Sequence, residues 1–419
     1  MKVFKFGGVS VQDVDRIKNV ANILAEYEGE KLVIIISAMG KTTNALEKVV
    51  NAFFEGNKEQ ALQLFNIVKQ QHVTIAKYLL VTHYNPCYAQ LNDFFTEVEW
   101  LLHDKPVREY DYYYDQIVCV GELMSTCIVS AFLNEVGIKN ILLDVRDIVR
   151  TDNNFRDAVI DWKHTTKVAK EMIDFDKSNI YITQGFIGAT DDNESTTLGR
   201  EGSDYSAAIF ANILDAESQT IWKDVAGVMN ADPKIFPEAV VLNELSFDEV
   251  IEMAYYGAQV IHPKTIKPLQ NKGIPLHVKC FLDSSIQGTT ITKKQTKHLP
   301  PIYVVKQKQV LVHLHSQDFS FVGDEPIIAL YQIFKEIKIK PNLIQTGAVS
   351  LQLCVDDRAD KVEQLASAAS AIFDVQIENG LELLSIRHYD DTIIARLTEG
   401  KQIVLEQKTT DTLQVLYRG

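Results

Sequence analysis

The sequence predicts an α/β protein with a mainly parallel central sheet, followed by smaller α+β modules of the ferredoxin-like kind. In the first 60 residues, short apolar stretches alternate with segments whose apolar residues recur at helical spacing. Residues 32–36 read LVIII, a continuous apolar run typical of a strand covered on both faces. Residues 309–378 read strand, helix, strand, strand, helix, strand, which is the order of a ferredoxin-like plait.

The elements of the first 280 residues follow from the same apolar patterns. Strands are expected at 3–6, 32–36, 140–143, 179–186, 220–223 and 275–279. Helices are expected at 12–27, 44–54, 58–103 with a break near Pro86, 115–136, 161–173, 203–212 and 247–256. Because strands and helices alternate with short links, we expect right-handed crossovers and a parallel sheet.

The composition changes at about residues 290–305, where Lys293, Lys294 and Lys297 precede the segment HLPP. We interpret this stretch as a linker, which separates a first domain at 1–292 from a ferredoxin-like domain at 305–380. Residues 381–419 are expected to form a partial or degenerate second module. That module is predicted as four strands without a helix, at 383–387, 392–397, 402–407 and 412–417.

Composition and charge exclude several classes of function. The chain has 419 residues and a formal net charge of −14, whereas nucleic acid is met by clustered Lys and Arg, so we expect no nucleic-acid partner. The five cysteines form no CxxC pair, which favours reduced, buried thiols over disulfides or zinc ligands. No apolar run approaches the roughly 18 residues of a membrane helix, and the N-terminus lacks the apolar core of a signal peptide. We therefore expect a cytoplasmic protein without membrane association.

Four polar, glycine-bearing stretches each follow a predicted strand, and open α/β sheets bind ligands beyond the carboxyl ends of their strands. The first is KFGGVS, residues 5–10. Gly7 and Gly8 would let the backbone approach a phosphate closely, and Lys5 would place its ammonium on a transferred phosphate. A plain strand–helix turn explains the same six residues about equally well. The second is SAMGKTTN, residues 37–44, whose hydroxyls and helix start suit an anion as well as an N-cap.

The third stretch is TTLGREGSDYSA, residues 196–207, and a purely structural loop rarely needs so many functional side chains. Arg200 can hold a carboxylate through two hydrogen bonds, and Asp204 lies near a helix start. The fourth is WKDVAGVMNADPKI, residues 222–235, where Asp224 and Lys234 suit a nucleotide but also a surface Asp-Pro turn. Glu122, inside an apolar helix, is either a partly exposed surface residue or the partner of a substrate ammonium.

These motifs, taken together and in this order, resemble the aspartate kinase branch of the amino acid kinase family over the full length of the chain. The KFGGTS pattern of that branch stands here as KFGGVS, its Ser-Ala turn begins at Ser37, and its TDxxFxxA pattern occupies 151–158. TQGFIG stands at 183–188, TTLGRxGSD at 196–204, the tryptophan–aspartate stretch at 222–234 and Ile-His-Pro at 261–263. No single motif is decisive, whereas the ordered set is specific.

The resemblance implies a three-layer αβα kinase domain at 1–292, an ACT-like regulatory domain at 305–380 and a degenerate second ACT-like module at 381–419. It implies a homodimer formed through the ACT-like modules. The implied reaction transfers a phosphoryl group from ATP to the side-chain carboxylate of L-aspartate, giving 4-phospho-L-aspartate, the first step of lysine, methionine and threonine biosynthesis. Mg²⁺ would be held mainly through the ATP phosphates. Since a carboxylate is already nucleophilic, positioning and charge neutralisation carry the catalysis.

The resemblance also implies roles for individual residues. Lys5 would stabilise the transferring phosphoryl group, and Asp204 would organise the reacting groups. The aspartate-binding residues would be Thr43, Glu122, Arg200 and Ser203. The residues along the phosphates and the nucleotide would be Lys5, Gly7, Gly8, Ser37, Lys223, Asp224, Met229, Lys234 and Gln259.

Three residues depart from the pattern of that branch, which has threonine, glycine and often lysine where this chain has Val9, Glu201 and Gln259. Each change could weaken nucleotide binding. The effector-site stretch of relatives, I-D-L-I-x-T-S-E-V-S, stands here at 341–350, with Gly347-Ala348 in place of Ser-Glu. We therefore expect weak or absent feedback inhibition by lysine or threonine, while the module still supports dimerisation. We expect no fused homoserine dehydrogenase domain in this chain.

Two alternatives stay open at this point. One is a sister kinase of the same fold acting on glutamate, acetylglutamate or UMP, which the insertion at 58–112 and the ACT-like half disfavour. The other is an amino-acid sensor with an inactive kinase domain. Lys5, Arg200 and Asp204 are intact, which disfavours the sensor, while Val9 and Glu201 keep it open.

Overall fold

The computed structural model of the protein describes residues 1–296, 298–318 and 320–418. The chain divides into two compact units. The first unit comprises Met1–Val228, Val241–Ala254 and Gln259–Thr296, and the second comprises Met229–Val240, Tyr255–Ala258 and Lys297–Gly419. Each unit is built around its own β-sheet, and the two sheets differ in kind.

The first unit contains an eight-stranded sheet in the order β3-β4-β2-β1-β7-β9-β10-β8. Its strands are β1 (Lys2–Phe6), β2 (Leu32–Ile36), β3 (Ile141–Leu143), β4 (Ile180–Gln184), β7 (Ser218–Lys223), β8 (Glu244–Ser246), β9 (Leu276–Cys280) and β10 (Thr289–Thr292). The six strands from β3 to β9 run parallel to one another, and β10 pairs with β9 in the antiparallel sense. The prediction of a mainly parallel sheet is therefore confirmed.

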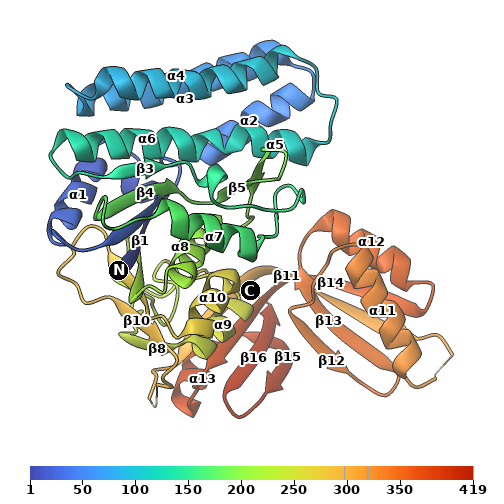
Figure 1. The fold of residues 1–419 in the computed structure, drawn as a ribbon. Helices are drawn as coiled ribbons and strands as arrows, with labels where there is room; N and C mark the ends of the chain where they lie inside the picture. The colour runs from blue at the N-terminus through green and yellow to red at the C-terminus, as the bar shows by residue number, and fades with distance from the viewer. Residues whose placement is uncertain (297, 319, 419) are drawn as a thin grey trace. The chain divides into compact units, whose positions relative to one another are not determined.

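Helices cover both faces of this sheet, as expected from a strand such as β2 whose five residues are all buried. Figure 1 shows α6 (Val120–Glu135) on one side of the strands and α8 (Gly202–Ile213) on the other. The remaining helices near the sheet are η1 (Gly8–Val11), α1 (Val14–Ala25), α2 (Thr42–Phe54), α5 (Tyr110–Val118), η2 (Val145–Asp147), α7 (Trp162–Met172), α9 (Phe247–Tyr255) and α10 (Pro263–Lys272). The three-layer αβα arrangement is confirmed.

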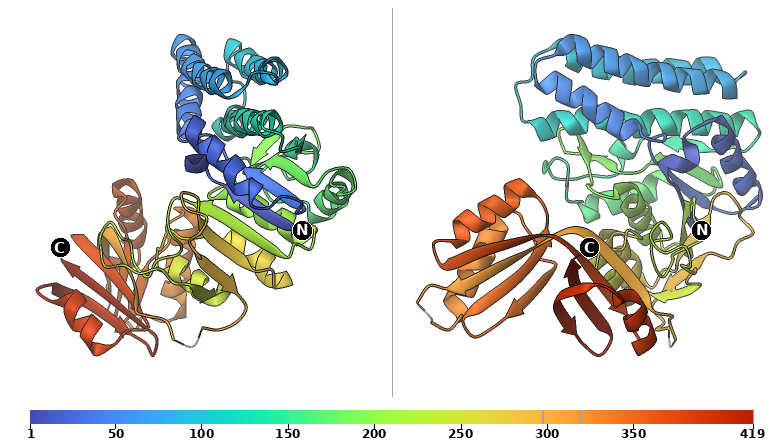
Figure 2. Two further views of the ribbon diagram at one scale, coloured as in Figure 1. Left: turned by 90° about the vertical axis from the view of Figure 1, so that its left-hand side faces the viewer. Right: turned by 180° about the vertical axis from the view of Figure 1, so that it is seen from behind.

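The predicted helical segment at 58–103 is a pair of helices, α3 (Lys58–Leu79) and α4 (Tyr84–His103). The expected break near Pro86 lies slightly earlier, at residues 80–83. Pro86 instead sits in the first turn of α4, where a missing backbone N–H removes no intrahelical hydrogen bond. The α3–α4 pair lies beyond α6, on the side that faces away from the sheet (Figures 1 and 2).

Several elements of the first unit differ from the sequence prediction. The strand expected at 179–186 ends at Gln184, and Phe186 has a left-handed backbone with φ of 71°. A short hairpin of β5 (Ile187–Ala189) and β6 (Ser195–Thr197) follows. Helix α10 and strands β8 and β10 were not predicted, because none of them shows a long apolar period.

One helical stretch, Tyr110–Glu135, is long and apolar enough to pass for a membrane span, contrary to the expectation from the sequence. Within its most apolar window, 89% is buried inside the protein. The stretch contains α5 and α6, and α6 is the helix that packs on the sheet. Its apolar character therefore reflects a helix of the protein core.

The second unit contains a six-stranded antiparallel sheet in the order β12-β13-β11-β14-β16-β15. Its elements are β11 (Ile302–Ser316), α11 (Asp324–Glu336), β12 (Leu343–Thr346), β13 (Ser350–Asp356), α12 (Ala359–Ala369), β14 (Phe373–Arg387), α13 (Asp391–Thr398), β15 (Gln402–Lys408) and β16 (Thr412–Arg418). The first six elements have the predicted order β-α-β-β-α-β. The two helices α11 and α12 share a core with β11 and β13.

The prediction that residues 381–418 contain only strands is wrong. Residues 391–398 form helix α13, where a strand at 392–397 was expected. The side chain of Asp390 accepts a hydrogen bond from the backbone N–H of Ile393 at 2.8 Å, which is the geometry of an N-cap. Ile393 and Leu397, four residues apart, are buried on one face of the helix. The segment after residue 388 can be followed in red in Figure 2.

The stretch interpreted as a linker, 290–305, also contains more regular structure than expected. Strand β10 extends to Thr292, and β11 begins at Ile302. Strands β11 and β14 are 15 residues long, and they pair with each other on both sides of an irregularity near Gln309. A single sheet therefore joins residues 305–380 to residues 381–418.

Candidate active site

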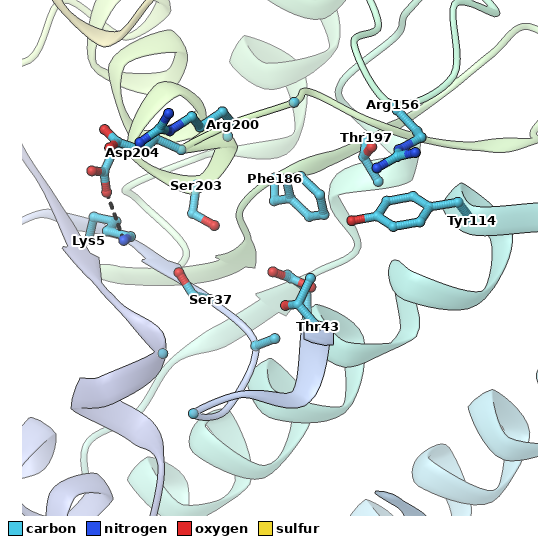
Figure 3. A pocket seen from close by; sticks show the side chains of 17 residues that line it. Lys5, Ser37, Thr43, Tyr114, Arg156, Phe186, Thr197, Arg200, Ser203 and Asp204 are labelled. Carbon is cyan, nitrogen blue, oxygen red and sulfur yellow. Dashed lines mark ion pairs between the residues drawn. The ribbon is translucent and has the colours of Figure 1, made fainter. Parts of the chain in front are cut away.

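A pocket of about 420 Å³ opens beyond the carboxyl ends of β1, β2 and β4. It brings together eight of the predicted site residues: Lys5, Gly8, Ser37, Thr43, Glu122, Arg200, Ser203 and Asp204. These residues come from four separate segments of the chain, and Figure 3 shows most of them pointing into the same space. The expectation that the strand-end stretches converge is met for the first three stretches and for Glu122.

An ion pair between Lys5 and Asp204 lies at one end of the pocket (Figure 3). The Lys5 Nζ is 2.7 Å from Oδ1 of Asp204, and the two side chains are 12% and 5% exposed. Burial alone would raise the pKa of Asp204, but the charges of Lys5 and Lys223 outweigh it and lower that pKa. The Asp204 carboxylate is therefore ionised at neutral pH and holds the Lys5 ammonium in place.

The backbone of the KFGGVS turn packs directly against the turn that follows β2. A Cβ atom at Gly8 would lie 2.6 Å from the carbonyl oxygen of Ala38 and 3.0 Å from that of Gly40. The backbone N–H of Gly40 also donates a hydrogen bond to the Gly8 carbonyl at 2.9 Å. Gly8 is thus required for the close approach of the two turns. Gly7 does not line the pocket, although Lys5 and Gly8 do.

Glu122 is a buried carboxylate on α6 that faces the pocket. Its side chain is 3% exposed, and among the described residues its Oε2 atom has no hydrogen-bond partner. Burial raises the pKa of Glu122 to about 8, against smaller opposing effects of the Ala38 backbone N–H and the Lys5 charge. A buried polar atom without a partner is costly in the free protein. Glu122 is therefore prepared to receive a cationic group.

The loop before α8 holds three of the expected residues at the pocket. Ser203 and Asp204 are buried in the first turn of α8, while Arg200 is exposed in the loop. Glu201, the residue before α8, has a left-handed backbone with φ of 54°. Three such non-glycine residues line the pocket, namely Arg156, Phe186 and Glu201. Backbone strain of this kind is concentrated at functional sites.

The carboxylate of Glu201 has a specific partner in the fold. Its Oε2 accepts a hydrogen bond from the backbone N–H of His262 at 2.7 Å. His262 is the N-cap of α10, where the helix dipole favours negative charge. The negative charge of Glu201 is thus partly compensated by the N-terminus of helix α10.

Nine residues line the pocket without having been predicted as site residues: Ala38, Gly40, Tyr114, Arg156, Phe186, Thr197, Gly199, Glu201 and Gly202. Phe186 lies in the motif at 183–188 and Thr197 in the motif at 196–204. Their membership of these motifs could have predicted that they line the pocket. Arg156 lies in the motif at 151–158, but as one of its variable letters. No sequence pattern distinguishes Tyr114 from the other tyrosines around it.

The buried carboxylate of Asp115 fixes the backbone of two pocket-lining residues, Arg156 and Thr197. Its Oδ2 accepts hydrogen bonds from the backbone N–H groups of Arg156 at 2.9 Å and of Thr197 at 2.8 Å. Its Oδ1 accepts one from the Thr197 hydroxyl at 2.7 Å. Asp115 is fully buried, and burial raises its pKa to about 6 against these hydrogen bonds. It acts as a positioning residue for two pocket-lining groups.

Five of the residues predicted along the nucleotide do not line the pocket: Lys223, Asp224, Met229, Lys234 and Gln259. Strand β7 pairs with β1 so that Trp222 lies beside Phe6, which places Lys223 and Asp224 at the same sheet edge as Gly7. The Lys223 Nζ donates to the Val260 carbonyl at 2.7 Å. Asp224 and Gln259 are exposed in the first unit, whereas Met229 and Lys234 belong to the second unit. The nucleotide contacts of these five residues stay predictions.

Comparison with known proteins identifies the family. Residues 1–280 match the model described as "Amino acid kinase family". The chain belongs to the amino acid kinase family. The match covers the parallel sheet, the Lys5–Asp204 ion pair and every residue that lines the pocket, so the site described above lies within the family domain.

Curated relatives within this family include plant and bacterial enzymes. The chain is 33% identical over 372 residues to "Aspartokinase 1, chloroplastic" of Arabidopsis thaliana, a match that covers 84% of this chain and 63% of the plant protein. It is 29% identical over 396 residues to "Lysine-sensitive aspartokinase 3" of Escherichia coli, covering 92% of this chain and 86% of that protein. The chain thus spans less than two thirds of the plant relative's length.

Solved structures extend the similarity to the second unit. Aspartokinase III of E. coli in complex with aspartate and ADP matches with a TM-score of 0.83 and 27% identity, over all of this chain and 96% of that chain. The aspartate kinase of Clostridium acetobutylicum matches with a TM-score of 0.79 at 19% identity, over all of this chain and 96% of that chain. The second of these supports the fold alone.

Proposed function

We propose that this protein is an aspartate kinase, which transfers the γ-phosphoryl group of ATP to the side-chain carboxylate of L-aspartate and forms 4-phospho-L-aspartate. The observation that carries the proposal is one pocket that contains both the Lys5–Asp204 ion pair and the Glu122 carboxylate, whose Oε2 has no hydrogen-bond partner in the described part of the chain. A phosphoryl-transfer site needs a fixed cation, and an amino-acid substrate needs an anionic partner for its ammonium.

Similarity to enzymes of known name supports the same reaction. The E. coli relative whose structure holds aspartate and ADP matches the whole of this chain. The curated plant relatives carry the name aspartokinase, although this chain spans only 63% of the first of them. In this proposal the reaction is the first step of lysine, methionine and threonine biosynthesis, and it takes place in the cytoplasm.

In the proposed mechanism Lys5 neutralises charge on the transferring phosphoryl group. Its ammonium is fixed by Asp204 at 2.7 Å, so little reorganisation is needed during the reaction. Asp204 keeps Lys5 charged and oriented, and the charge of Lys223, which lies outside the pocket lining, also favours the ionised form of Asp204. The attacking carboxylate of the substrate is already ionised at neutral pH, so no general base is required.

In this proposal ATP lies at the turn around Gly8, which lines the pocket and packs against the turn that follows β2. Gly7, Gly8 and Ser37 would hold the phosphates, and Lys223, Asp224, Met229, Lys234 and Gln259 would lie along the rest of the nucleotide. Among the described residues, no group of three His, Cys, Asp or Glu side chains forms a metal site. In this proposal Mg²⁺ would be bound mainly to the ATP phosphates, where it would supply charge neutralisation.

Four side chains would bind the substrate. Glu122 would receive the α-ammonium, because its Oε2 is buried and lacks another partner among the described residues. Thr43 and Ser203 would donate hydroxyl hydrogen bonds to substrate carboxylate oxygens. Arg200 would add a guanidinium from the loop before α8, where its exposed position lets it move onto the substrate.

We further propose that the second unit regulates or assembles the enzyme. The predicted organisation is a catalytic domain at 1–292, an ACT-like domain at 305–380 and a degenerate ACT-like module at 381–419, with dimerisation through the ACT-like modules. Strands β11 and β14 pair along their whole length in one sheet. This pairing supports treating residues 305–380 and 381–419 as one structural unit. Sedimentation or light scattering of the full chain, compared with a chain ending at residue 296, tests the dimer.

The proposed function is tested by measuring ADP release from ATP and Mg²⁺ with and without L-aspartate, with hydroxylamine present to trap the acyl phosphate. We expect release that depends on L-aspartate and yields aspartate hydroxamate. Turnover with glutamate, acetylglutamate or UMP instead of aspartate would establish a sister kinase. ATP binding without turnover on any of the four would favour the amino-acid sensor.

A further inference from the structure

We propose that Glu201 is a positioning residue, whose carboxylate fastens the loop that carries Arg200 to the N-terminus of α10 and so holds Arg200 where it binds the substrate. This role rests on the proposed function and adds a residue to it, because Glu201 has no part in the mechanism described above. From the sequence alone we expected only that the negative charge of Glu201 weakens nucleotide binding.

The loop that carries Arg200 runs from Leu198 to Glu201 and joins β6 to α8. Both neighbours of Arg200 have left-handed backbones, with φ of 78° at Gly199 and 54° at Glu201. Arg200 itself is exposed. The place from which its guanidinium reaches the substrate therefore depends on how the backbone of this loop is held.

Glu201 connects the loop to the first turns of two helices. Its side-chain Oε2 accepts a hydrogen bond from the backbone N–H of His262, the N-cap of α10, at 2.7 Å. Its backbone carbonyl accepts hydrogen bonds from the N–H groups of Asp204 at 3.1 Å and Tyr205 at 3.2 Å, at the start of α8. The residue that follows Arg200 is thus fixed by its side chain and by its main chain.

The other end of the loop also contacts α10. The Nζ of Lys264, in the first turn of that helix, donates to the Leu198 carbonyl at 3.4 Å and forms an ion pair with Asp157. The first and the last residue of the loop are therefore both held by the N-terminal end of α10. Arg200 lies between these two points of attachment.

The fold keeps a strained residue at position 201. Glycine adopts a φ of 54° without the steric cost that a glutamate has there. A hydrogen bond from a carboxylate to the N-terminus of a helix is favourable and offsets part of this cost. Non-glycine residues persist in such conformations where the surrounding structure holds them, and they concentrate at functional sites. Replacing Glu201 by glycine therefore removes the strain and the contact with α10 together.

The test compares Glu201→Ala, Glu201→Gly and Glu201→Gln with the unmodified enzyme, through kcat and the KM values for L-aspartate and ATP. Without the contact, the loop spends less time in the position that binds substrate, and the apparent affinity falls by the same factor. In the alanine and glycine variants we expect the KM for L-aspartate to rise about 3- to 30-fold, with kcat and the KM for ATP nearly unchanged. In Glu201→Gln the amide oxygen can still accept from His262, so the rise should stay below about threefold.

Thermal unfolding separates positioning from a purely structural role. Glu201→Ala keeps the left-handed strain and loses the hydrogen bond, so it should unfold at a lower temperature than the unmodified chain. Glu201→Gly loses both, so its unfolding temperature should lie nearer to that of the unmodified chain, while its KM for L-aspartate stays raised. If Glu201 were only structural, the KM would instead follow the unfolding temperature.

Glu135→Ala is a matched control. Oε2 of Glu135 also accepts a hydrogen bond from the backbone N–H of a histidine N-cap, His83 of α4, at 2.8 Å, but Glu135 does not line the pocket. We expect Glu135→Ala to lower the unfolding temperature and to leave kcat and both KM values unchanged.

A double variant tests whether Glu201 acts through Arg200. Arg200→Gln removes the guanidinium that the loop presents, so a further change at Glu201 should have nothing left to misplace. We expect Arg200→Gln/Glu201→Gly to have the same KM for L-aspartate as Arg200→Gln alone. Effects that multiply in the double variant would overturn the action of Glu201 through Arg200.

The remaining outcomes distinguish this role from the proposed function. If the unmodified enzyme shows no aspartate-dependent turnover, the proposed function is wrong, and calorimetric titration with L-aspartate compares the same variants without turnover. No binding of L-aspartate by the unmodified chain would then overturn the role of Glu201 as well. A lower KM for ATP in Glu201→Gly, with the KM for L-aspartate unchanged, would show that Glu201 only repels the nucleotide.

Discussion

The ammonium of Lys5 lies 2.7 Å from Oδ1 of Asp204, and both side chains are nearly buried at the end of the pocket. The two residues are 199 positions apart in the chain, so the pair forms only when β1 and α8 meet. Removing one partner of a buried ion pair leaves an uncompensated charge. The pair is therefore expected to affect both stability and catalysis, and its two effects can be separated.

Lys5→Met is predicted to lower kcat by about 10²- to 10³-fold, the usual cost of removing one group that stabilises developing charge. The same variant should lose about 3–5 kcal/mol of stability, because Asp204 is left buried and unpaired. The double variant Lys5→Met/Asp204→Asn should regain most of the stability while staying inactive. Denaturant unfolding and aspartate-dependent ADP release measure the two effects.

Lys2→Met is the matched control for this experiment. Lys2 lies on the same strand and pairs with Glu30 at 2.9 Å, but it does not line the pocket. Its loss should change kcat little and stability by no more than about 1 kcal/mol, as for other exposed ion pairs. Equal losses of activity in Lys2→Met and Lys5→Met would contradict the assignment of Lys5.

Glu122 is predicted to give aspartate binding a distinct pH dependence. Its folded-state pKa is about 8, against an ordinary value of 4.5, so the folded protein holds a proton that the unfolded chain releases between these values. The stability of the free protein should therefore fall as the pH rises from about 4.5 to about 8, and Glu122→Gln should lack this slope. The sign follows because the folded state binds more protons than the unfolded state in that window.

The substrate ammonium favours the ionised form of Glu122, so binding below pH 8 should release up to about one proton and strengthen as the pH rises toward 8. Calorimetric titration with L-aspartate in two buffers of different ionisation enthalpy at pH 7.5 measures the proton count. At that pH Asp115, whose pKa is about 6, contributes little. Proton uptake on binding, or equal release by Glu122→Gln, would show that Glu122 does not receive the ammonium.

Gly8→Ala and Gly7→Ala are predicted to differ in stability. The new Cβ at Gly8 would lie 2.6 Å from the Ala38 carbonyl, so the two turns must separate, and both folding stability and ATP binding should suffer. At Gly7 the nearest atom would be the Lys5 Nζ at 3.4 Å, which is ordinary contact. Gly7→Ala should therefore unfold like the unmodified chain while binding ATP more weakly. Thermal unfolding with and without ATP separates the two; equal unfolding temperatures would argue against the tight turn.

Feedback inhibition by lysine or threonine is predicted to be weak. Asn342, at the start of the stretch that binds effectors in relatives, already uses its whole amide. Its Nδ2 donates to Gln309 and to Asp356, both at 2.8 Å, and its Oδ1 accepts from Lys306 at 2.7 Å. An effector would have to break these hydrogen bonds. We expect each amino acid to change the rate by less than about fivefold, the lower end of typical allosteric coupling. Strong inhibition by sub-millimolar lysine would overturn this prediction.

The elements predicted well were those with a strong local pattern. Strand β2 is a run of five buried residues, and α1 repeats apolar residues on one face, so each carries its own signal. The sequence predicts a strand at 392–397, and this prediction is wrong because the apolar residues there fit a helical period as well as an extended one. The helical state of this segment depends on the Asp390 cap and on the burial of Ile393 and Leu397 against other strands. Such contacts lie outside any local window.

The residues that depart from the family motifs also have surroundings that the sequence does not predict. Val9 replaces a threonine beside the glycine pair, and we expected this change to weaken nucleotide binding. In the structure Val9 is 41% exposed and does not line the pocket. Its effect on ATP affinity stays a prediction. Glu201 does line the pocket, but its carboxylate is held by the His262 backbone N–H. The sequence predicts no site role for Arg156, although this cationic residue lines the pocket.

By itself the sequence determined the parallel sheet, the ferredoxin-like order of residues 309–378, the strand-end motifs that contain Lys5 and Asp204, and the apolar helix that contains Glu122, because these depend on local periodicity and short patterns. The tertiary structure alone decided which of those residues share one pocket, that the Glu122 carboxylate is buried with Oε2 lacking a hydrogen-bond partner in the described part of the chain, and that Arg156 faces the same space. Burial, pairing and pKa are set by atoms that the fold brings close from distant positions in the chain.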